Sequence, residues 1–236
     1  MNSSINQANE KPDMGGQVLR RLAQVFGQTF LIMAILLIAA GRWDWGWAWA
    51  YLGVGLAILA INALVVPPEL IAERGKRKEN VKRWDKVITS LMLIPALAIF
   101  VVAGLDERFG WSPDMSPAMH VVGLALVALS QGLFTWAMVS NKFFSTAVRI
   151  QVDRGHTVAT GGTYRYVRHP GYAALIVFWF ALAPAFGSLW ALIPAGLNAC
   201  LYIARTALED KMLQKELEGY KEYAQRVRYR LLPGVW

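Results

Sequence analysis

Long apolar runs alternate with short polar segments along most of this chain. A membrane-spanning helix needs about 20 mostly apolar residues, because the hydrocarbon core is about 30 Å thick and a helix rises about 1.5 Å per residue. Four runs meet this requirement without interruption: Leu22–Ala40, Trp47–Val66, Val87–Leu105 and Ala118–Ser140. The pattern therefore predicts four membrane helices before residue 141.

The last apolar stretch, Gly171–Ala204, is too long for a single span. It is interrupted by the segment Pro184–Ser188, whose proline, glycine and serine favour a tight turn. We expect a helical hairpin with arms at Gly171–Ala183 and Leu189–Ala204, the first of them short for a full crossing. The predicted fold is an all-α integral membrane protein with about five to six transmembrane helices.

The overall composition agrees with a membrane protein and excludes two other classes. Apolar residues make up 56% of the chain, charged residues 17%, and the mean hydropathy is +0.35. A soluble domain carries about 25% charged residues, so a water-soluble globular enzyme is excluded. The aromatic content of 12% excludes a disordered chain. The single cysteine, Cys200, excludes an intramolecular disulfide and a multi-thiolate metal site.

The distribution of basic residues predicts the orientation in the membrane. Of the 24 Lys and Arg residues, 22 lie in the alternate segments 1–21, 67–86, 141–170 and 205–236. Because basic loops face the cytoplasm, we expect both termini there, in a multi-pass protein of a plasma, inner or ER-like membrane. Loops that face anionic lipid also explain the net charge of +8 without a nucleic-acid partner.

The chain divides into a cytoplasmic N-terminal tail (1–21), a four-helix membrane region (22–140) and a C-terminal region (141–236). The apolar runs contain no Asp, Glu, Lys or Arg, whereas ion pumps and proton-coupled transporters need such groups at depth. No phosphate-loop or dinucleotide glycine pattern occurs, which disfavours a nicotinamide-dependent reductase. His156 and His169 are not spaced as a chelating pair, so we expect no metal.

A cluster of tryptophans lies where the first two predicted spans meet: Trp43, Trp45, Trp47 and Trp49. Tryptophan is enriched at membrane–water interfaces, where its amphipathic ring sits at the level of the headgroups. We expect the cluster to anchor the helix ends rather than to form a binding cage.

The loop Asn141–Tyr172 concentrates the polar chemistry of the chain. It is far longer than the connections of about 2–8 residues that usually join neighbouring helices. Pro170 is suited to begin the hairpin helix, which would place Arg168 and His169 at a positive helix N-terminus with free backbone N–H groups. Such a place favours an anionic ligand group such as a carboxylate. A plain juxtamembrane loop with basic anchors explains the same residues.

A second polar cluster follows the hairpin. Arg205 and Glu209 are four residues apart and share a helix face, so they form either an interfacial ion pair or part of a site. In a site, Arg205 can hold a carboxylate through two donors, and Glu209 can accept hydrogen bonds from a cofactor hydroxyl or amine. The helix is expected to continue toward residue 230 with an apolar stripe, lying on the membrane or capping loop 141–170.

Three motifs of the C-terminal region together resemble one known family. They are the run YRYVRHPGY at Tyr164–Tyr172, the pair Arg205 and Glu209, and the later Gly219-Tyr220 with Tyr223. The chain over about residues 140–236 resembles the isoprenylcysteine carboxyl methyltransferase family, whose relatives include phospholipid methyltransferases. The resemblance implies an integral membrane enzyme that uses S-adenosyl-L-methionine (SAM), with a cytoplasmic cofactor pocket in region 141–236.

The resemblance also implies roles for individual residues. The implied cofactor-binding residues are Gln151, His156, Thr157, Val158, Ala159, Tyr164, His169, Pro170, Gly171, Tyr172 and Glu209. Arg205 is implied to bind the substrate. The candidate catalytic residues are Arg205, His169 and Tyr172.

The scarcity of acid–base residues is compatible with methyl transfer to a carboxylate. A carboxylate with a pKa near ~4 is already ionised at pH 7 and needs no general base. We therefore expect carboxyl O-methylation of an isoprenylcysteine-like or other lipophilic carboxylate. A phospholipid amine or a small thiol is an alternative acceptor, and a thiol with a pKa of ~8.5 needs a base such as His169 or Tyr172. A non-catalytic membrane scaffold or carrier predicts instead that no cofactor-sized pocket exists.

Overall fold

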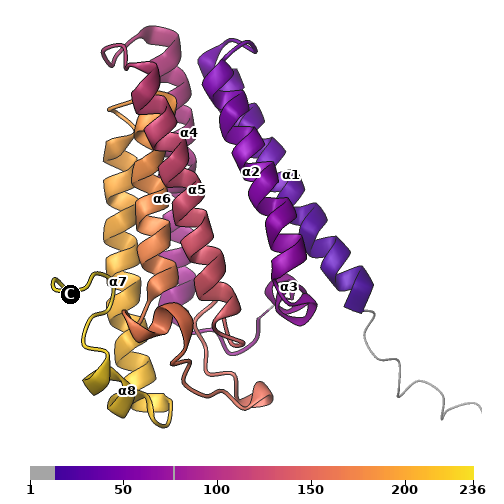
Figure 1. Cartoon of the computed structure of the whole chain (residues 1–236), viewed down its shortest axis with the longest axis vertical. Helices are drawn as coiled ribbons and strands as arrows, with labels where there is room; N and C mark the ends of the chain where they lie inside the picture. The colour runs from indigo at the N-terminus through magenta and orange to yellow at the C-terminus, as the bar shows by residue number, and fades with distance from the viewer. Residues whose placement is uncertain (1–13, 77) are drawn as a thin grey trace, which may run out of the picture.

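The computed structural model describes residues 14–76 and 78–236, and the regular structure of this part is entirely helical (Figure 1). The helices are α1 (Met14–Ala40), α2 (Gly46–Val65), α3 (Pro68–Gly75), α4 (Arg83–Phe109), α5 (Pro117–Val139), η1 (Val152–Arg154), η2 (Gly162–Arg165), α6 (Pro170–Phe186), α7 (Leu192–Glu216) and α8 (Tyr220–Arg226). The predicted all-α class is confirmed. Residues 1–13 of the predicted tail lie outside the described residues, whereas residues 14–21 form the first turns of α1.

Four helices, α1, α2, α4 and α5, are long and apolar enough to cross a membrane. α6 is also apolar but has 17 residues, and α7 has 25 residues with a polar second half. The helices extend beyond the apolar runs: α1 begins at Met14 rather than Leu22, and α4 begins at Arg83 rather than Val87. Hydrophobicity marks the part of a helix that suits hydrocarbon, not the point where its backbone hydrogen bonds end.

The predicted hairpin exists, but its turn lies later than Pro184. α6 continues through Pro184 to Phe186, and Gly187, with φ of 74°, ends it in the left-handed conformation typical of helix C-termini. The following Ser188 hydroxyl donates to Asp106 at 2.5 Å, and Asp106 is 3% exposed at the end of α4. This bond ties the hairpin turn to the neighbouring helix end.

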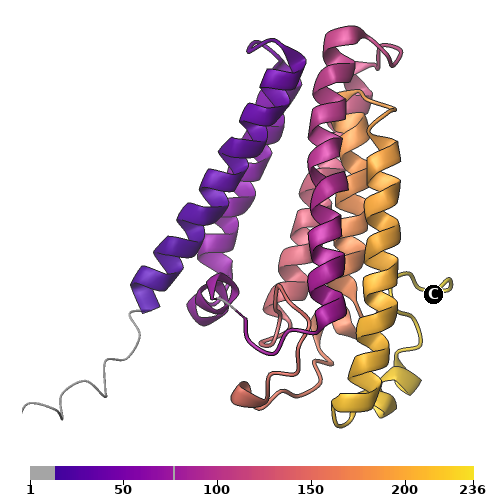
Figure 2. The ribbon, with the colours of Figure 1, turned by 180° about the vertical axis from the view of Figure 1, so that it is seen from behind.

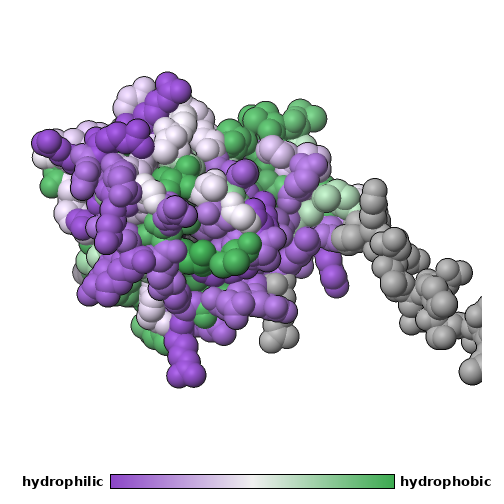
Figure 3. Space-filling model, turned by 90° about the horizontal axis from the view of Figure 1, so that it is seen from below, coloured by the Kyte–Doolittle hydropathy of each residue, from purple (hydrophilic) through white to green (hydrophobic). Residues whose placement is uncertain are grey.

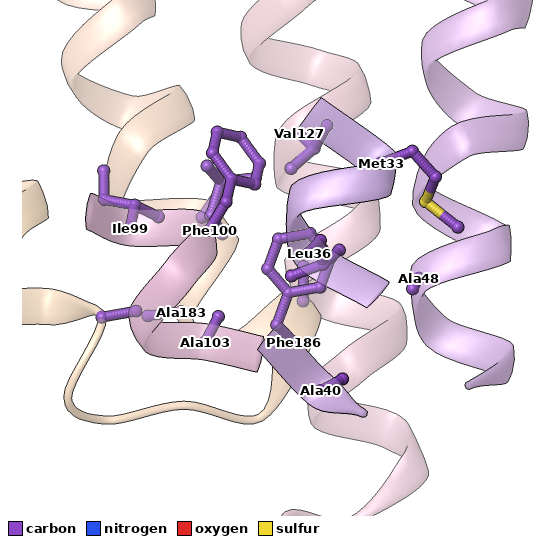
Figure 4. Close-up of a cluster of buried hydrophobic side chains, with 14 of the residues drawn as sticks. Met33, Leu36, Ala40, Ala48, Ile99, Phe100, Ala103, Val127, Ala183 and Phe186 are labelled. Atoms are coloured by element: carbon purple, nitrogen blue, oxygen red, sulfur yellow. The ribbon is translucent and has the colours of Figure 1, made fainter. Parts of the chain in front are cut away.

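The helices form two groups that meet near one end of the molecule. α4, α5, α6 and α7 pack side by side, whereas α1 and α2 form a pair that approaches them at one end and diverges toward the end that carries α3 and α8 (Figures 1 and 2). A cluster of buried side chains, including Leu36, Ile99 and Phe186, fills the meeting point (Figure 4). Gly104 permits this approach, because a Cβ there would lie 2.6 Å from the carbonyl oxygen of Leu36.

The tryptophan cluster is only partly an interface anchor. Trp43 and Trp49 are exposed, as predicted. Trp45 is 3% exposed and packs on Phe186, and Trp47 stacks in parallel on His120 with ring centroids 4.5 Å apart. For Trp45 the prediction was therefore wrong, whereas Trp47 is half-buried and its anchoring role stays a prediction. Residues two apart on a helix point in nearly opposite directions, so Trp47 and Trp49 cannot share one environment.

The polar end of the molecule folds into a second, smaller core. The predicted continuous helix to residue 230 is wrong, because α7 ends at Glu216 and α8 begins at Tyr220 after Gly219 adopts a φ of 77°. The apolar stripe nevertheless packs on the long loop, in a buried cluster of Val148, Tyr164, Met212, Leu213, Leu217, Tyr220 and Tyr223. Of the two alternatives, capping of loop 141–170 is confirmed. Seen from this end, the surface is largely hydrophilic (Figure 3).

Candidate active site

A cleft lies at this end of the helix bundle, between the loop after α5, the first turn of α6, the end of α7 and α8. About 790 Å³ of space lies between its walls, a volume that includes open solvent. The predicted site residues that line it are Gln151, His156, Thr157, Val158, Ala159, Tyr164, His169, Gly171, Tyr172 and Glu209. Pro170 and Arg205 are not among its lining residues.

The tight turn at Gly161–Gly162 positions one aromatic wall of the cleft. Gly162 has a φ of 54°, and a Cβ there would lie 2.0 Å from the Oγ of Ser140, so only glycine fits. The following 3₁₀ turn buries Tyr164, whose backbone carbonyl accepts a hydrogen bond of 2.8 Å from the hydroxyl of Tyr223. Burial raises the pKa of Tyr164, so its phenol remains protonated at pH 7.

Glu209 presents an unpaired carboxylate to the cleft. It lies on α7, and its Oε2 accepts a 2.5 Å hydrogen bond from the hydroxyl of Tyr172 on α6. Within the described part of the chain, no ion pair involves Glu209. The guanidinium of Arg205 lies near this half-buried carboxylate but is paired with Asp85. The Glu209 carboxylate is therefore available to a ligand that brings hydroxyl or amine donors or a positive charge.

Arg205 has a different partner from the one expected. Its Nε donates to Oδ1 of Asp85 at 2.7 Å, and its Nη2 donates to Oδ2 of Asp85 at 3.3 Å and to the carbonyl of Thr146 at 3.1 Å. Its guanidinium lies 5.1 Å from the ring centroid of Tyr172. The expected Arg205–Glu209 ion pair is not found among the described residues, and Asp85 occupies the donors predicted to hold a substrate carboxylate. A contact between Arg205 and substrate stays a prediction.

Asp85 is a residue that the sequence analysis missed. It is 1% exposed near the start of α4 and also accepts a 2.8 Å hydrogen bond from the backbone N–H of Val148. Through Arg205 and Val148 it joins α4, α7 and the long loop behind the cleft. An acid in the first turn of a helix is ordinarily explained by the helix dipole, so its position along the chain does not indicate a long-range partner.

The backbone amides just before α6 are occupied by the C-terminal segment. The backbone N–H of Arg168 donates to the carbonyl of Tyr229 at 2.9 Å, and that of His169 donates to the carbonyl of Arg230 at 2.8 Å. The C-terminal segment therefore occupies these two amides. The anion site expected beside them, in the first turn of α6, stays a prediction. The His169 ring lies parallel to the Tyr172 ring at 5.8 Å and remains at the cleft wall.

Asp210, next to Glu209, was not among the predicted site residues. It is fully buried and accepts hydrogen bonds of 2.7–3.1 Å from Arg168, Gln214, Tyr220 and Arg230. Although burial acts in the opposite direction, His169, Arg168 and Arg230 hold the pKa of Asp210 well below its usual range. Asp210 thereby joins the loop, α7, α8 and the C-terminal segment. The arginines in the sequence YRYVRH and near residue 230 could have indicated that a buried acid pairs with them.

Gln151 and His156 form a local polar network at the edge of the cleft. The Gln151 amide donates to the carbonyl of Phe143 and accepts from Arg154, both at 2.6 Å. The Nδ1 of His156 accepts from the backbone N–H of Gln151 at 3.3 Å, so its proton lies on Nε2. Burial, and then the charges of Arg149 and Arg154, lower the pKa of His156 to about 4. At pH 7 the ring is neutral and lines the cleft.

The lowered pKa of His156 predicts a loss of stability in mild acid. The unfolded chain binds a proton at His156 near pH 6.5, but the folded chain does so only near the folded pKa of about 4. Stability contributed by this residue therefore falls as the pH drops from 6.5 toward 4. We expect His156→Gln to reduce the fall in melting temperature between pH 6.5 and 5 in detergent. An unchanged pH profile in the variant would contradict the assignment.

The sequence was also compared with known proteins. Residues 118–219 match the family model described as phospholipid methyltransferase. This segment runs from the start of α5 to the turn before α8 and contains every predicted site residue. The match agrees with the resemblance seen in the motifs of the loop and of α7.

Two curated relatives are similar over a longer segment. Both are named probable protein-S-isoprenylcysteine O-methyltransferase, one from Oryza sativa subsp. indica and one from Oryza sativa subsp. japonica. Each is 25% identical over 154 residues, which cover 61% of this chain and 80% of the relative. With the helical fold and the family match, this similarity confirms the predicted resemblance and supports a membrane methyltransferase.

Proposed function

We propose that this protein is a SAM-dependent methyltransferase whose cofactor occupies the cleft between loop 141–170, α7 and α8. The observation that carries the proposal is the convergence of predicted cofactor residues from two distant parts of the chain, among them His156, Tyr172 and Glu209, on a single cleft. A scaffold or carrier without a cofactor does not require such a cleft, so its presence speaks against that alternative.

The residues present fit the chemistry of SAM. The carboxylate of Glu209 faces the cleft with only the Tyr172 hydroxyl as a hydrogen-bond partner among the described residues. Such a carboxylate suits a ligand that carries an amine, ribose hydroxyls and a sulfonium. The rings of Phe143, Tyr164 and Tyr220 supply apolar lining for an aromatic base.

When bound, SAM supplies an electrophilic methyl group on a positively charged sulfur. Tyr172 holds the Glu209 carboxylate in place by its 2.5 Å hydrogen bond, so that this carboxylate is oriented before a ligand binds. The capping of the loop by the α7 and α8 side chains excludes water from one wall. Methyl transfer from a sulfonium to an anion neutralises charge and is favoured where water is scarce.

The acceptor in this proposal is a lipophilic carboxylate of the isoprenylcysteine type that approaches from the bilayer. An ionised carboxylate needs no general base, so this acceptor does not require His169 or Tyr172 to remove a proton. Arg205 uses Nε and Nη2 for Asp85 and Thr146, and within the described residues its Nη1 makes no hydrogen bond. We expect a carboxylate acceptor to contact Nη1 alone.

The proposal is tested first by titrating the purified full-length chain with S-adenosylhomocysteine in a calorimeter. We expect saturable one-to-one binding, and the absence of binding by a folded sample contradicts the proposal. Membranes that contain the chain are then supplied with SAM labelled in the methyl group. A base-labile methyl ester is expected, whereas a base-stable lipid or a volatile thioether would reassign the acceptor to an amine or a thiol.

A further inference from the structure

A second group of cations lies beside the cleft and has no part in the function proposed above. Arg74, near the end of α3, places its guanidinium 5.6 Å from the ring centroid of Phe134 and 5.2 Å from that of Phe144. Phe134 belongs to α5, and Phe144 lines the cleft. Arg74 is therefore separated from the cleft by a single aromatic ring.

Arg74 lacks an anionic partner in the part of the chain that the structure describes. No hydrogen bond or ion pair of Arg74 occurs among residues 14–76 and 78–236, and its Nη1 is enclosed without a partner. The nearest acid along the chain, Glu73, is already occupied by Lys78 at 2.7 Å and by Arg149 at 3.6 Å. Arg74 is half-buried, and Nη1 is its enclosed nitrogen without a partner. An enclosed cationic donor without a counter-charge is costly, so an anion from outside the described chain would stabilise this position.

A second guanidinium shares the same environment. The side chain of Arg21, on α1, packs against the end of α3, since a Cβ at Gly75 would lie 3.3 Å from the Cβ of Arg21. Burial, and then the charge of Arg21, lower the pKa of Arg74 to about 10. Two neighbouring guanidiniums without an acid between them repel each other until an anion binds.

The surroundings of these two arginines are those of a membrane surface. α1 and α5 are both helices long and apolar enough to span a membrane, and Arg21 and Arg74 lie toward the end that carries α3. Leu19 on α1 and Trp136 on α5 are exposed near this level, a tryptophan being typical of the headgroup region. An anion that reaches Arg74 here is carried most simply by a lipid.

We propose that Arg74 and Arg21 bind the phosphate of an anionic phospholipid headgroup at the predicted cytoplasmic surface, against the Phe134–Phe144 pair. The planar guanidinium can donate two parallel hydrogen bonds to phosphate oxygens while its face rests on the aromatic rings. The site does not depend on methyl transfer and would persist if the cleft had another ligand. It would place an anionic lipid directly behind the ring of Phe144.

The test uses the full-length chain in a neutral detergent and native mass spectrometry. The probes are dioleoylphosphatidylglycerol, which is anionic, and dioleoylphosphatidylcholine, which is zwitterionic. We expect the wild type to retain the anionic lipid about tenfold more strongly, and Arg74→Gln to reduce this preference to near unity. Lys76→Gln is the matched control, because it removes one positive charge from an exposed neighbour and should leave the preference unchanged.

Each other outcome has a defined meaning. If the wild type shows no preference for the anionic lipid, the proposal is overturned. It is also overturned if Arg74→Gln and Lys76→Gln reduce the preference equally, because the lipid then responds to overall charge and not to a specific site. Displacement of the anionic lipid by millimolar inorganic phosphate would replace the lipid with a free anion as the ligand. If Arg74→Gln lowers the melting temperature, the lipid preference is measured for Arg21→Gln instead. If Arg21→Gln keeps the preference for the anionic lipid, Arg21 and Arg74 do not form one site.

Discussion

Replacing Glu209 by Gln should weaken the binding of S-adenosylhomocysteine by about 100-fold while the fold is retained. A hydrogen bond to a charged acceptor contributes up to about 3 kcal/mol, which corresponds to roughly that factor. Glu209 makes no ion pair among the described residues, and its one side-chain hydrogen bond comes from Tyr172, so the neutral amide disturbs little else. Calorimetric titration measures the affinity, and thermal unfolding in the same detergent measures the stability.

The matched control for this prediction is Glu218→Gln. Glu218 is exposed in the turn between α7 and α8 and does not line the cleft, so the same charge change should leave the affinity within about twofold. If Glu209→Gln binds as tightly as the wild type, Glu209 is not a cofactor ligand. If both variants weaken binding equally, the effect belongs to the overall charge of this face and not to a contact.

The parts of the site that could be predicted from the sequence are those that depend on local order along the chain. Pro170 begins a helix and Gly162 requires a left-handed turn, so the loop between them brings Tyr164 and His169 to one region. The pairing of Glu209 with Tyr172 across two helices agrees with the predicted hairpin. Backbone preferences and helical spacing predicted the turn and the hairpin, whereas the family resemblance predicted which side chains form the site.

The parts that could not be predicted are the long-range charge pairs. Arg205 and Asp85 are 120 residues apart, and Arg168 and Asp210 are 42 apart, so no pattern of neighbouring residues connects them. The helical spacing of Arg205 and Glu209 indicated a pair, but a buried acid on α4 competes for the same guanidinium. In a low-dielectric interior an arginine pairs with the acid that is least able to reach water, and Asp85 is less exposed than Glu209.

The Asp85–Arg205 pair also affects how an Arg205→Ala variant is interpreted. An Arg205→Ala variant removes a candidate substrate contact, but it also leaves Asp85 as a buried carboxylate without its cation. Loss of turnover in that variant therefore reports on the fold as much as on the acceptor. Arg205→Lys keeps a positive charge near Asp85 and is the better test of a carboxylate contact at Nη1, because it removes the planar group without removing the charge.

Replacing Asp210 by Asn should destabilise the protein more than any other single change of a charged residue at this end. Asp210 is completely buried and accepts hydrogen bonds from Arg168 and Arg230, so the substitution leaves two guanidiniums without their carboxylate. Removing one partner of a buried ion pair costs about 3–5 kcal/mol. We expect a lower melting temperature in detergent and faster proteolysis of the segment that follows α7.

The pH dependence of stability and a control variant distinguish the destabilisation by Asp210→Asn from the effect of losing any one negative charge. The pKa of Asp210 is lowered by His169, Arg168 and Arg230 against the effect of burial, so its stabilisation is complete above the unfolded value near ~3.9 and is lost as the pH falls below it. The wild type should therefore lose stability steeply below about pH 4, and Asp210→Asn should show a shallower loss there. Asp153→Asn removes an exposed carboxylate paired with Arg149 and should change the melting temperature little. If the two variants are equally stable, Asp210 does not hold the walls of the cleft together, and the loop, α8 and the C-terminal segment must be held by their apolar contacts alone.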